Sequence, residues 1–325
     1  MKQITARKFK VAIKRDPAWA ATLTEPVEIT DYCDMRGSMI THLSTQLYFM
    51  GRDEVGMSAN FSECPNIKVA EGNFAGPVAF IDSGVEKVGE LHIAVPDSNG
   101  KAASFSECPN LKVAEGTFPG CVNFSDSGIE RIGEIKITAP DNDGIAASFE
   151  DCKDLKMAEG IFLGYVAFCR SGVKIIGALC ITDPDNYGSA ASFKACTNLK
   201  VAEGTFPGYV VFSGIGVEKI GELHITSPNK DGIAAFFYDC QSLKVAEGTF
   251  PGCVNFSGSG IERIRELHIA APDKDGIAAS FYGCPKLKVA EGTFPGYVEF
   301  DDSGVEKIGD LHITSPSKKG IAVSF

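Results

Sequence analysis

The feature that most constrains this chain is an internal repeat of 44 residues that runs without insertion or deletion. Phenylalanine recurs at this spacing, and cysteine recurs three residues after all but the last of these phenylalanines. The positions are Phe61, Phe105, Phe149, Phe193, Phe237, Phe281 and Phe325, with Cys64, Cys108, Cys152, Cys196, Cys240 and Cys284. Six full units therefore cover residues 61–324. Repeats of this length predict a stacked architecture in which each unit buries its apolar side against its neighbour.

Each unit divides into a Phe-x-x-Cys half of about 19 residues and a Phe-x-x-Ser-Gly half of about 25, each the length of one solenoid coil. Apolar and polar residues alternate in the Leu-Lys-Val segment of one half and the Leu-His-Ile segment of the other, as in half-buried strands. Glycine and proline recur too often for long helices. We therefore expect coils whose strands stack in parallel at about 4.8 Å.

The phenylalanines predict the core. Of the 22 in the chain, only Phe9, Phe49 and Phe236 lie outside the repeated positions. A buried phenylalanine contributes roughly 1.5 to 3 kcal/mol relative to an exposed one. The rings of successive coils are expected to stack inside, so that an isolated unit does not fold.

The two half-units resemble a known family. The segment Phe61-Ser-Glu-Cys64-Pro-Asn-Ile67-Lys68 and the Phe-x-x-Ser-Gly-Ile-Glu-x-Ile segment from Phe124 to Ile132 are similar to the BspA-like leucine-rich repeats of bacteria and some protists. The resemblance covers about Leu47 to Phe325. It implies a β-rich, leucine-rich-repeat-like solenoid with a parallel sheet of short strands on the concave face. It also implies mostly loops and short helical turns on the other side, and a role in binding or adhesion.

The first 46 residues lie outside the period. We interpret residues 1–46 as an N-terminal cap, which a solenoid needs over its terminal coil, and residues 47–325 as the solenoid. The cap opens with a basic stretch from Lys2 to Arg15. This stretch leaves open an anionic partner or an organelle presequence as alternatives.

Charge and hydropathy limit the partners and the compartment. The formal net charge is -11, which argues against nucleic acid because phosphate binding needs clustered positive charge. No run of about 18 apolar residues exists, so no membrane span is predicted. Because the N-terminal stretch lacks the apolar segment of a secretory signal, a cytoplasmic location is expected, with export by another route left open.

A polar strip is the main candidate binding surface. Histidine stands in the middle of the Leu-His-Ile segments and lysine in the middle of the Leu-Lys-Val segments, so both should point out of the sheet. We expect one strip in which they alternate, either simply solvated or contacting a ligand. It comprises His92, Lys112, Lys156, Lys200, His224, Lys244, His268, Lys288 and His312. No metal site is expected there, because ligands two coils apart cannot converge to about 2.1 Å from one ion.

A second repeated feature is acidic. Glutamate recurs within Ala-Glu-Gly just past each Leu-Lys-Val segment, where we expect a turn. Pairing with lysine or turn amides is the simpler role, and recognition of a basic partner is the alternative. The row comprises Glu71, Glu115, Glu159, Glu203, Glu247 and Glu291. The Pro-Asp-x-Asp-Gly loops, such as Asp141 to Gly144, predict turns with glycine at positive φ rather than calcium loops.

The third unit departs from the others. It has Ile175 and Cys180 where the other units have charged or polar residues, which is either sequence drift or an apolar contact for a partner. The six repeated cysteines stand about 10 Å apart if they lie two coils apart, too far for disulfides. Small buried free thiols are therefore expected.

These patterns favour a non-enzymatic binding scaffold that presents a broad surface to a protein or a glycan, with no cofactor, no metal and no catalytic residues. A self-associating structural or adhesive element is one alternative, because the sequence ends on Phe325 with no polar cap to cover an open edge. An enzyme is the other. It is disfavoured because the repeated polar residues are spread evenly rather than gathered in one pocket.

Overall fold

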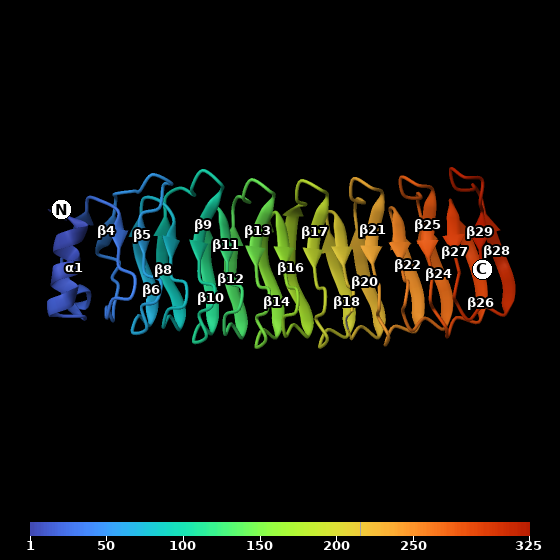
Figure 1. The fold of residues 1–325 in the computed structure, drawn as a ribbon, viewed down its shortest axis with the longest axis horizontal. Helices are drawn as coiled ribbons and strands as arrows, with labels where there is room; N and C mark the ends of the chain where they lie inside the picture. Colours follow the sequence, from blue (N-terminus) through green and yellow to red (C-terminus); the bar gives the residue numbers. More distant parts are fainter. Residues whose placement is uncertain (215) are drawn as a thin grey trace. The chain divides into compact units, whose positions relative to one another are not determined.

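The computed structural model describes residues 1–214 and 216–325. These residues form two compact units, Met1–Val166 and Ala167–Phe325. Each unit consists of stacked coils of short parallel strands (Figure 1). The β-rich, solenoid-like parallel fold predicted from the repeat is therefore confirmed. No helix in the described residues is long and apolar enough to cross a membrane.

The first unit holds two parallel sheets. In the first sheet the strands are β1 (Lys2–Ile4), β2 (Val27–Ile29), β4 (Leu47–Phe49), β6 (Val69–Phe74), β8 (Lys87–Ile93), β10 (Val113–Phe118), β12 (Arg131–Ile137) and β14 (Met157–Leu163). In the second sheet they are β3 (Cys33–Asp34), β5 (Ala59–Asn60), β7 (Val78–Ala79), β9 (Lys101–Ser104), β11 (Cys121–Asn123) and β13 (Ile145–Ser148). Strand β15 (Tyr165–Ala167) includes the boundary between the units.

The second unit repeats this arrangement. The strands that correspond to those of the first sheet are β16 (Ile175–Asp183), β18 (Val201–Phe206), β20 (Lys219–Ile225), β22 (Val245–Phe250), β24 (Arg263–Ile269), β26 (Val289–Phe294) and β28 (Lys307–Ile313). The second sheet comprises β17 (Ser189–Ser192), β19 (Tyr209–Val211), β21 (Ile233–Phe236), β23 (Cys253–Asn255), β25 (Ile277–Ser280), β27 (Tyr297–Glu299) and β29 (Val323–Ser324).

The register of the second sheet gives the coil lengths. Ala103 pairs with Val122, 19 residues on, and Val122 pairs with Ala147, 25 residues on. These separations confirm the two half-units of about 19 and 25 residues. Because each half-unit makes one complete coil, residues with the same place in the repeat form rows across the stacked strands.

The head phenylalanines form the core of both units. Phe80, Phe105 and Phe124 stack with ring centroids 5.2 and 5.4 Å apart and rings within 8° of parallel. Phe212, Phe237 and Phe256 repeat this geometry in the second unit at 5.2 and 5.3 Å. These spacings follow the strand separation of about 4.8 Å. The predicted aromatic column is confirmed, since these rings have no more than about one per cent of their surface exposed.

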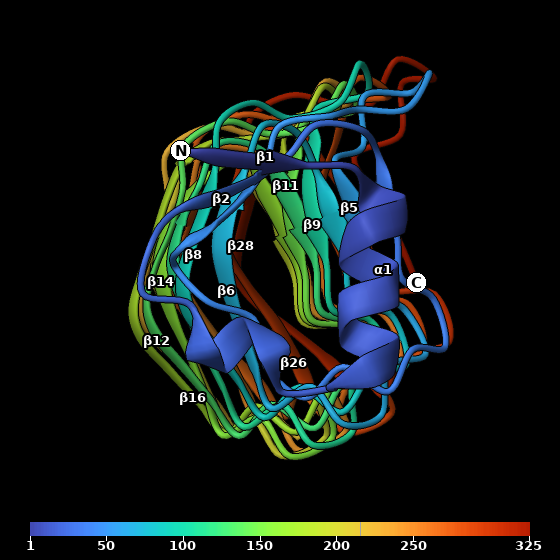
Figure 2. The same ribbon diagram turned by 90° about the vertical axis from the view of Figure 1, so that its left-hand side faces the viewer.

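The N-terminal residues add a helix to the first unit. Helix α1 (Ala6–Arg15) begins after Thr5, whose side chain accepts the Lys8 amide, and a 3-10 turn, η1 (Trp19–Thr22), follows. Figure 2 shows α1 on the side of the coil where β5 and β9 run. The buried Phe9 ring of α1 meets the Phe49 ring edge-on at 5.7 Å. The helix thereby extends the aromatic core, while the division into a cap over 1–46 and a solenoid over 47–325 stays a prediction.

The side of the coil opposite the first sheet differs from the expectation. Loops and short helical turns were expected there, but a second parallel sheet is present in each unit. Among the described residues, the helical segments are α1 and η1, both before Leu23. The expectation is wrong because the Ala-Ala segments at the end of each repeat are β-strands, and the Val-x-Phe segments begin as strands too. Their inward side chains pack against the phenylalanine column.

The repeated cysteines are buried free thiols, as predicted. Each thiol donates to a backbone carbonyl one coil earlier, as Cys108 Sγ does to the Phe80 oxygen at 2.9 Å and Cys284 Sγ to the Phe256 oxygen at 3.2 Å. Burial raises the pKa of these two thiols. They therefore remain protonated donors at neutral pH and act as packing groups.

The loops at the ends of the repeats are turns, also as predicted. Gly144 has φ of 91°, and the Asp141 carboxylate accepts the amides of Asp143 and Ile145 at 3.0 and 2.9 Å. Asp273 makes the same bonds to Asp275 and Ile277. The aspartate oxygen thus accepts hydrogen bonds from amides of its own turn. This explains why Asp or Asn stands three residues before the glycine in these loops.

Candidate binding site

The outward face of the first-sheet strands carries the polar residues singled out in the sequence. In β20, Ile220, Leu223 and Ile225 are buried, while the side chains between them are exposed. The exposed side chains of this strand form three positions, Lys219, Glu222 and His224. Because the pairs β6–β8, β10–β12, β18–β20, β22–β24 and β26–β28 share one register, these positions form parallel rows across each unit.

A β-bulge shapes the middle of this face. Ala202 of β18 pairs with Ile220 of β20, but Gly204 pairs with Leu223, so Gly221 and Glu222 together oppose Glu203. The expected turn at Ala-Glu-Gly is therefore wrong. The strand continues through Glu203 to Phe206, and the glycine that suggested a turn takes φ of 112° within the strand. A bulge with glycine in this conformation bends a strand without ending it.

The bulge brings carboxylates of neighbouring strands together into an acidic row. In the second unit, none of its carboxylate side chains has a hydrogen-bond or ion-pair partner among the described residues. The row comprises Glu203, Glu222, Glu247, Glu266, Glu291 and Asp310. In the first unit, burial and the neighbouring Glu90 raise the pKa of Glu71. The simpler role expected for these glutamates, pairing with lysine or turn amides, is thus not what the structure shows.

The lysines lie in a different row. Lys200, Lys244 and Lys288 stand just before their strands and each pairs with the glutamate of the next half-unit. The Nζ to carboxylate distances are 3.2 Å to Glu218, 3.8 Å to Glu262 and 2.6 Å to Glu306. In the first unit Lys112 and Lys156 both reach Glu130, at 3.0 and 3.2 Å. These two lysines lower the Glu130 pKa.

The histidines lie on the strands themselves, beside threonine rather than lysine. His224 pairs with Thr205, His268 with Thr249 and His312 with Thr293, whereas His92 in the first unit pairs with Asn73. The prediction that histidine and lysine alternate in one strip is wrong. Lys200 lies five residues before Thr205, roughly 15 Å along the strand. The strand runs from Val201 to Phe206, so the histidine segment pairs with Gly-Thr-Phe instead of Leu-Lys-Val.

All nine residues of the predicted strip are exposed. They lie in two separate rows, one of histidines and one of lysines that are paired with glutamates. The histidines lie on β8, β20, β24 and β28, and the lysines directly precede β10, β14, β18, β22 and β26. The acidic row lies between the two. A partner seated on this face would therefore meet the free carboxylates of the acidic row between the histidines and the paired lysines, while Lys219, Arg263 and Lys307 are exposed cations at the start of the same strands.

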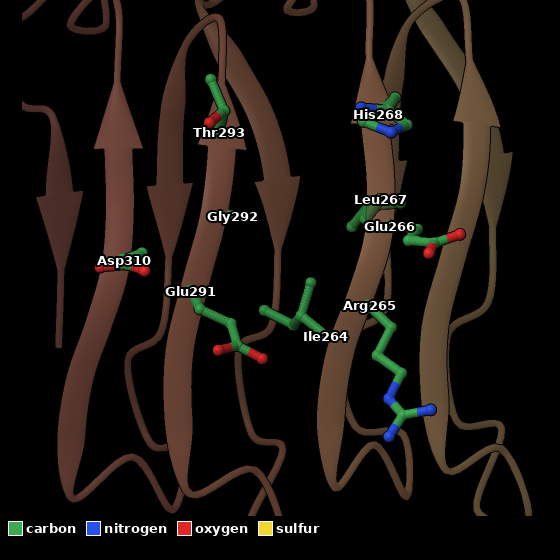
Figure 3. A pocket seen from close by; sticks show the side chains of 9 residues that line it. All are labelled: Ile264, Arg265, Glu266, Leu267, His268, Glu291, Gly292, Thr293 and Asp310. Carbon is green, nitrogen blue, oxygen red and sulfur yellow. The ribbon is translucent and has the colours of Figure 1, made fainter.

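One part of this face is hollowed. The hollow has a volume of about 530 Å³ and lies over β24, β26 and β28 (Figure 3). His268 and Thr293 border one end, and Glu291 reaches from its strand toward Ile264. Arg265 extends along β24 away from His268. The hollow therefore combines three carboxylates, from Glu266, Glu291 and Asp310, with one guanidinium group.

Arg265 is a residue that the sequence analysis missed. The other repeats have glycine at its position, for example Gly221, where an added Cβ would lie 3.4 Å from the Glu203 Cβ. Glu266, the next residue, has φ of 41°, an unfavourable value for a residue other than glycine. The sequence does contain the signal, because Arg265 replaces the glycine that the other five repeats have at this position. A comparison of the repeats at this position would have identified it.

The two apolar residues of the third unit lie on β16. Ile175 has 51% of its surface exposed and Cys180 is exposed, whereas the neighbouring Cys169 is buried. Together with Gly177 and Ala178, they leave this strand without the acid and the histidine of its counterparts. A role in partner contact stays a prediction.

The face offers charged and hydrogen-bonding side chains. Within residues 1–214 and 216–325, no three His, Cys, Asp or Glu side chains gather in a way that could hold a metal ion. Comparisons of the chain with protein-family models, with curated proteins and with solved structures found no match. The geometry and charge of this face therefore carry the functional interpretation.

Proposed function

We propose that this chain is a non-enzymatic binding scaffold of the leucine-rich-repeat type whose first-sheet face binds a basic segment of a partner protein. The observation that carries the proposal is the acidic row of the second unit. Its six carboxylates have no partner within the described part of the chain, although Lys200, Lys244 and Lys288 at the start of the same strands pair with other glutamates. A cationic segment would relieve the repulsion among them.

The neighbouring rows support a protein segment over a neutral glycan. Threonine and histidine side chains border the acidic row on one side and offer hydrogen bonds, and the strand residues between the exposed positions are buried. Interfaces place charge-complementary groups opposite each other, which raises the association rate and selects the partner. A neutral glycan would leave the carboxylates without counter-charge.

A matched pair of variants tests the proposal. The triple substitution Glu203→Gln, Glu247→Gln and Glu291→Gln removes three charges from the unpaired row. The control, Glu218→Gln, Glu262→Gln and Glu306→Gln, removes the same charge from the lysine-paired row. Fluorescence anisotropy with a labelled peptide of alternating lysine and serine measures binding. We expect the first variant to bind roughly tenfold more weakly and the control to bind as the unmodified chain does.

Salt gives a second readout. Raising the ionic strength from about 0.1 M to about 1 M shortens the Debye length from ~10 Å to ~3 Å, so binding should be largely lost. Equal weakening by both triple variants would show that net charge alone attracts the peptide. Equal binding by all three proteins would contradict the proposal outright.

Self-association stays a prediction beside this one. The last coil exposes Ile308, Ile321 and Phe325 by 59%, 46% and 54%. Sedimentation velocity over a range of concentrations measures it directly. A sedimentation coefficient that rises with concentration and falls back in an Ile308→Lys variant would support self-association, and a constant value would contradict it.

A further inference from the structure

A second hollow lies on the opposite sheet, within the first unit. It has a volume of about 280 Å³ and sits on the outward face of β7, β9 and β11. Pro77, Lys101 and Cys121 lie in one row beneath it, and Ser104 and Asn123 lie in the next row. This face is separate from the acidic row, which belongs to the first-sheet strands.

The other repeats show what this space holds when the chain fills it. Tyrosine stands at the position of Pro77 and Cys121 in three of them, as Tyr165, Tyr209 and Tyr297. The Tyr209 ring meets the Phe236 ring edge-on at 5.7 Å, and burial raises the pKa of its hydroxyl. The Tyr297 hydroxyl hydrogen-bonds the Ser324 hydroxyl at 2.5 Å. The ring thus lies over the sheet and reaches toward the next coil.

The period maps these contacts onto the hollow. Five repeats before Tyr297 the chain has Pro77, and five repeats before Ser324 it has Ser104. Both residues line the hollow. Pro77 has no aromatic ring to cover Ser104, and the next tyrosine position holds the small Cys121. The hollow is therefore the site of a tyrosine ring that the repeats of Pro77 and Cys121 lack, with the serine hydroxyl that would bind the phenol still in place.

The edge of the hollow also differs from the other repeats. Lys101 stands where Ile145, Ile233 and Ile277 stand elsewhere, so an exposed cation replaces an apolar side chain. Its side chain forms no ion pair with the described residues, and Asp97 lies close by in the same lining. Met57 and Ile81 give the hollow apolar walls. An apolar floor with a few polar groups at its rim is typical of a binding pocket.

We propose that this hollow binds a tyrosine side chain of a partner protein. The ring would take the place that Tyr297 takes in its own repeat, and its hydroxyl would bond to Ser104. Tyrosine is enriched at the centres of protein interfaces because it combines apolar area with a polar end. The inference rests on the proposed function as a protein-binding scaffold and adds a second contact on the other sheet.

The direct test uses p-cresol, which is the tyrosine side chain alone. Titration into the full chain is followed by the amide chemical shifts of Ala79, Lys101 and Asn123. We expect saturable shifts confined to this part of the second sheet, with a Kd on the order of 1 mM for so small a ligand. Toluene, which lacks the hydroxyl, should bind more weakly. The absence of shifts at concentrations well above that Kd would overturn the proposal.

A filled-pocket variant and a matched control sharpen the test. Pro77→Tyr supplies the missing ring, and its new amide can donate to the Gly56 carbonyl as the Tyr297 amide donates to the Gly276 carbonyl at 2.8 Å. We expect this variant to lose the p-cresol response. Cys253→Tyr places the same ring at the same repeat position of the second unit and should leave the response intact. Continued binding to Pro77→Tyr would overturn the proposal.

A third variant separates the hydroxyl contact from the fit of the ring and keeps the test decisive if Pro77→Tyr fails to fold. Ser104→Ala removes the hydroxyl, so p-cresol should lose its advantage over toluene. An unchanged advantage would contradict the assigned geometry. Because the acidic-row variants alter the other sheet, they should leave p-cresol binding unchanged. Failure of this proposal and failure of the basic-peptide proposal are thus distinguishable.

Discussion

The two units have the same aromatic core but differ in how their first-sheet strands join. In the first unit, the amide of Lys112 donates to the Glu86 carbonyl at 2.9 Å, and β12 pairs with β14 through Lys136 and Ile161. In the second unit, β18 pairs with β20, β22 with β24 and β26 with β28. No ladder joins one of these pairs to the next among the described residues.

The difference teaches which interactions hold the coils together. The phenylalanine column continues with centroid spacings of 5.0 to 5.4 Å from Phe80 to Phe149 and 5.1 to 5.5 Å from Phe168 to Phe325. The ring spacing is therefore the same whether or not a backbone hydrogen-bond ladder connects the neighbouring first-sheet strands. Burial of the rings and their stacking provide the common stabilisation, and the backbone ladder varies around it.

Truncating one ring in each unit gives the largest effect and tests this equivalence. Phe105 and Phe237 occupy the same repeat position and stack at nearly the same distances, so the variants Phe105→Ala and Phe237→Ala are matched. Each should lower the free energy of unfolding by about 3 to 5 kcal/mol, because a large cavity replaces a buried ring. Urea denaturation followed by circular dichroism measures the loss, and the sole tryptophan, Trp19, reports on the first unit alone.

The exposed Tyr282→Ala serves as the surface control and should change little. A much smaller loss for Phe237→Ala than for Phe105→Ala would mean that the missing ladder loosens the core of the second unit. The column would then no longer be the shared element of the two units.

The sequence predicted the inside of each unit better than its outside. Every repeat must bury the same rings, so the rows of Phe105 and Cys108 and the two coil lengths followed from spacing alone. The surface rows did not, because a bulge at Gly221 and Glu222 shifts the register by one residue midway along the strand. Residues that look equivalent in the sequence, such as Lys200 and His224, then lie in different rows.

The split between strand pairs could not be predicted at all. Lys112 and Lys244 occupy the same position in nearly identical segments, yet of the two amides only that of Lys112 has a backbone acceptor among the residues that the structure describes. Such differences arise from small shifts of neighbouring coils rather than from a residue type. The hollow over Pro77, in contrast, was readable in principle, because proline interrupts a column that elsewhere holds tyrosine or cysteine.

Hydrogen exchange sharpens the comparison at the level of single amides. The Lys112 amide should exchange more slowly than that of Lys244, because one net backbone hydrogen bond contributes about 1 kcal/mol, or roughly fivefold in the exchange rate. Lys156, which donates to the Glu130 carbonyl at 3.2 Å, should likewise exchange more slowly than Lys288. Equal protection at both pairs of sites would show that the strand pairs of the second unit join in solution.

The smallest expected effect comes from the ion pairs that accompany the joined strands. Glu130 accepts both Lys112 and Lys156, whereas its counterpart Glu262 pairs with Lys244 at 3.8 Å. Glu130→Gln should therefore lower the urea midpoint slightly more than Glu262→Gln. The pKa of Glu130 is lowered by these lysines from its ordinary value near 4.5, so the contribution is present above that value. It should disappear as the pH falls through the lowered pKa.

High salt should reduce the same contribution, because both lysines and Glu130 are substantially exposed. The urea midpoint of the unmodified chain should therefore approach that of Glu130→Gln both at low pH and at about 1 M salt. If Glu262→Gln lowers the midpoint as much as Glu130→Gln does, the doubly paired carboxylate does not link successive coils. The contrast between the units would then lie in the backbone ladder alone, which the exchange rates of Lys112 and Lys244 measure separately.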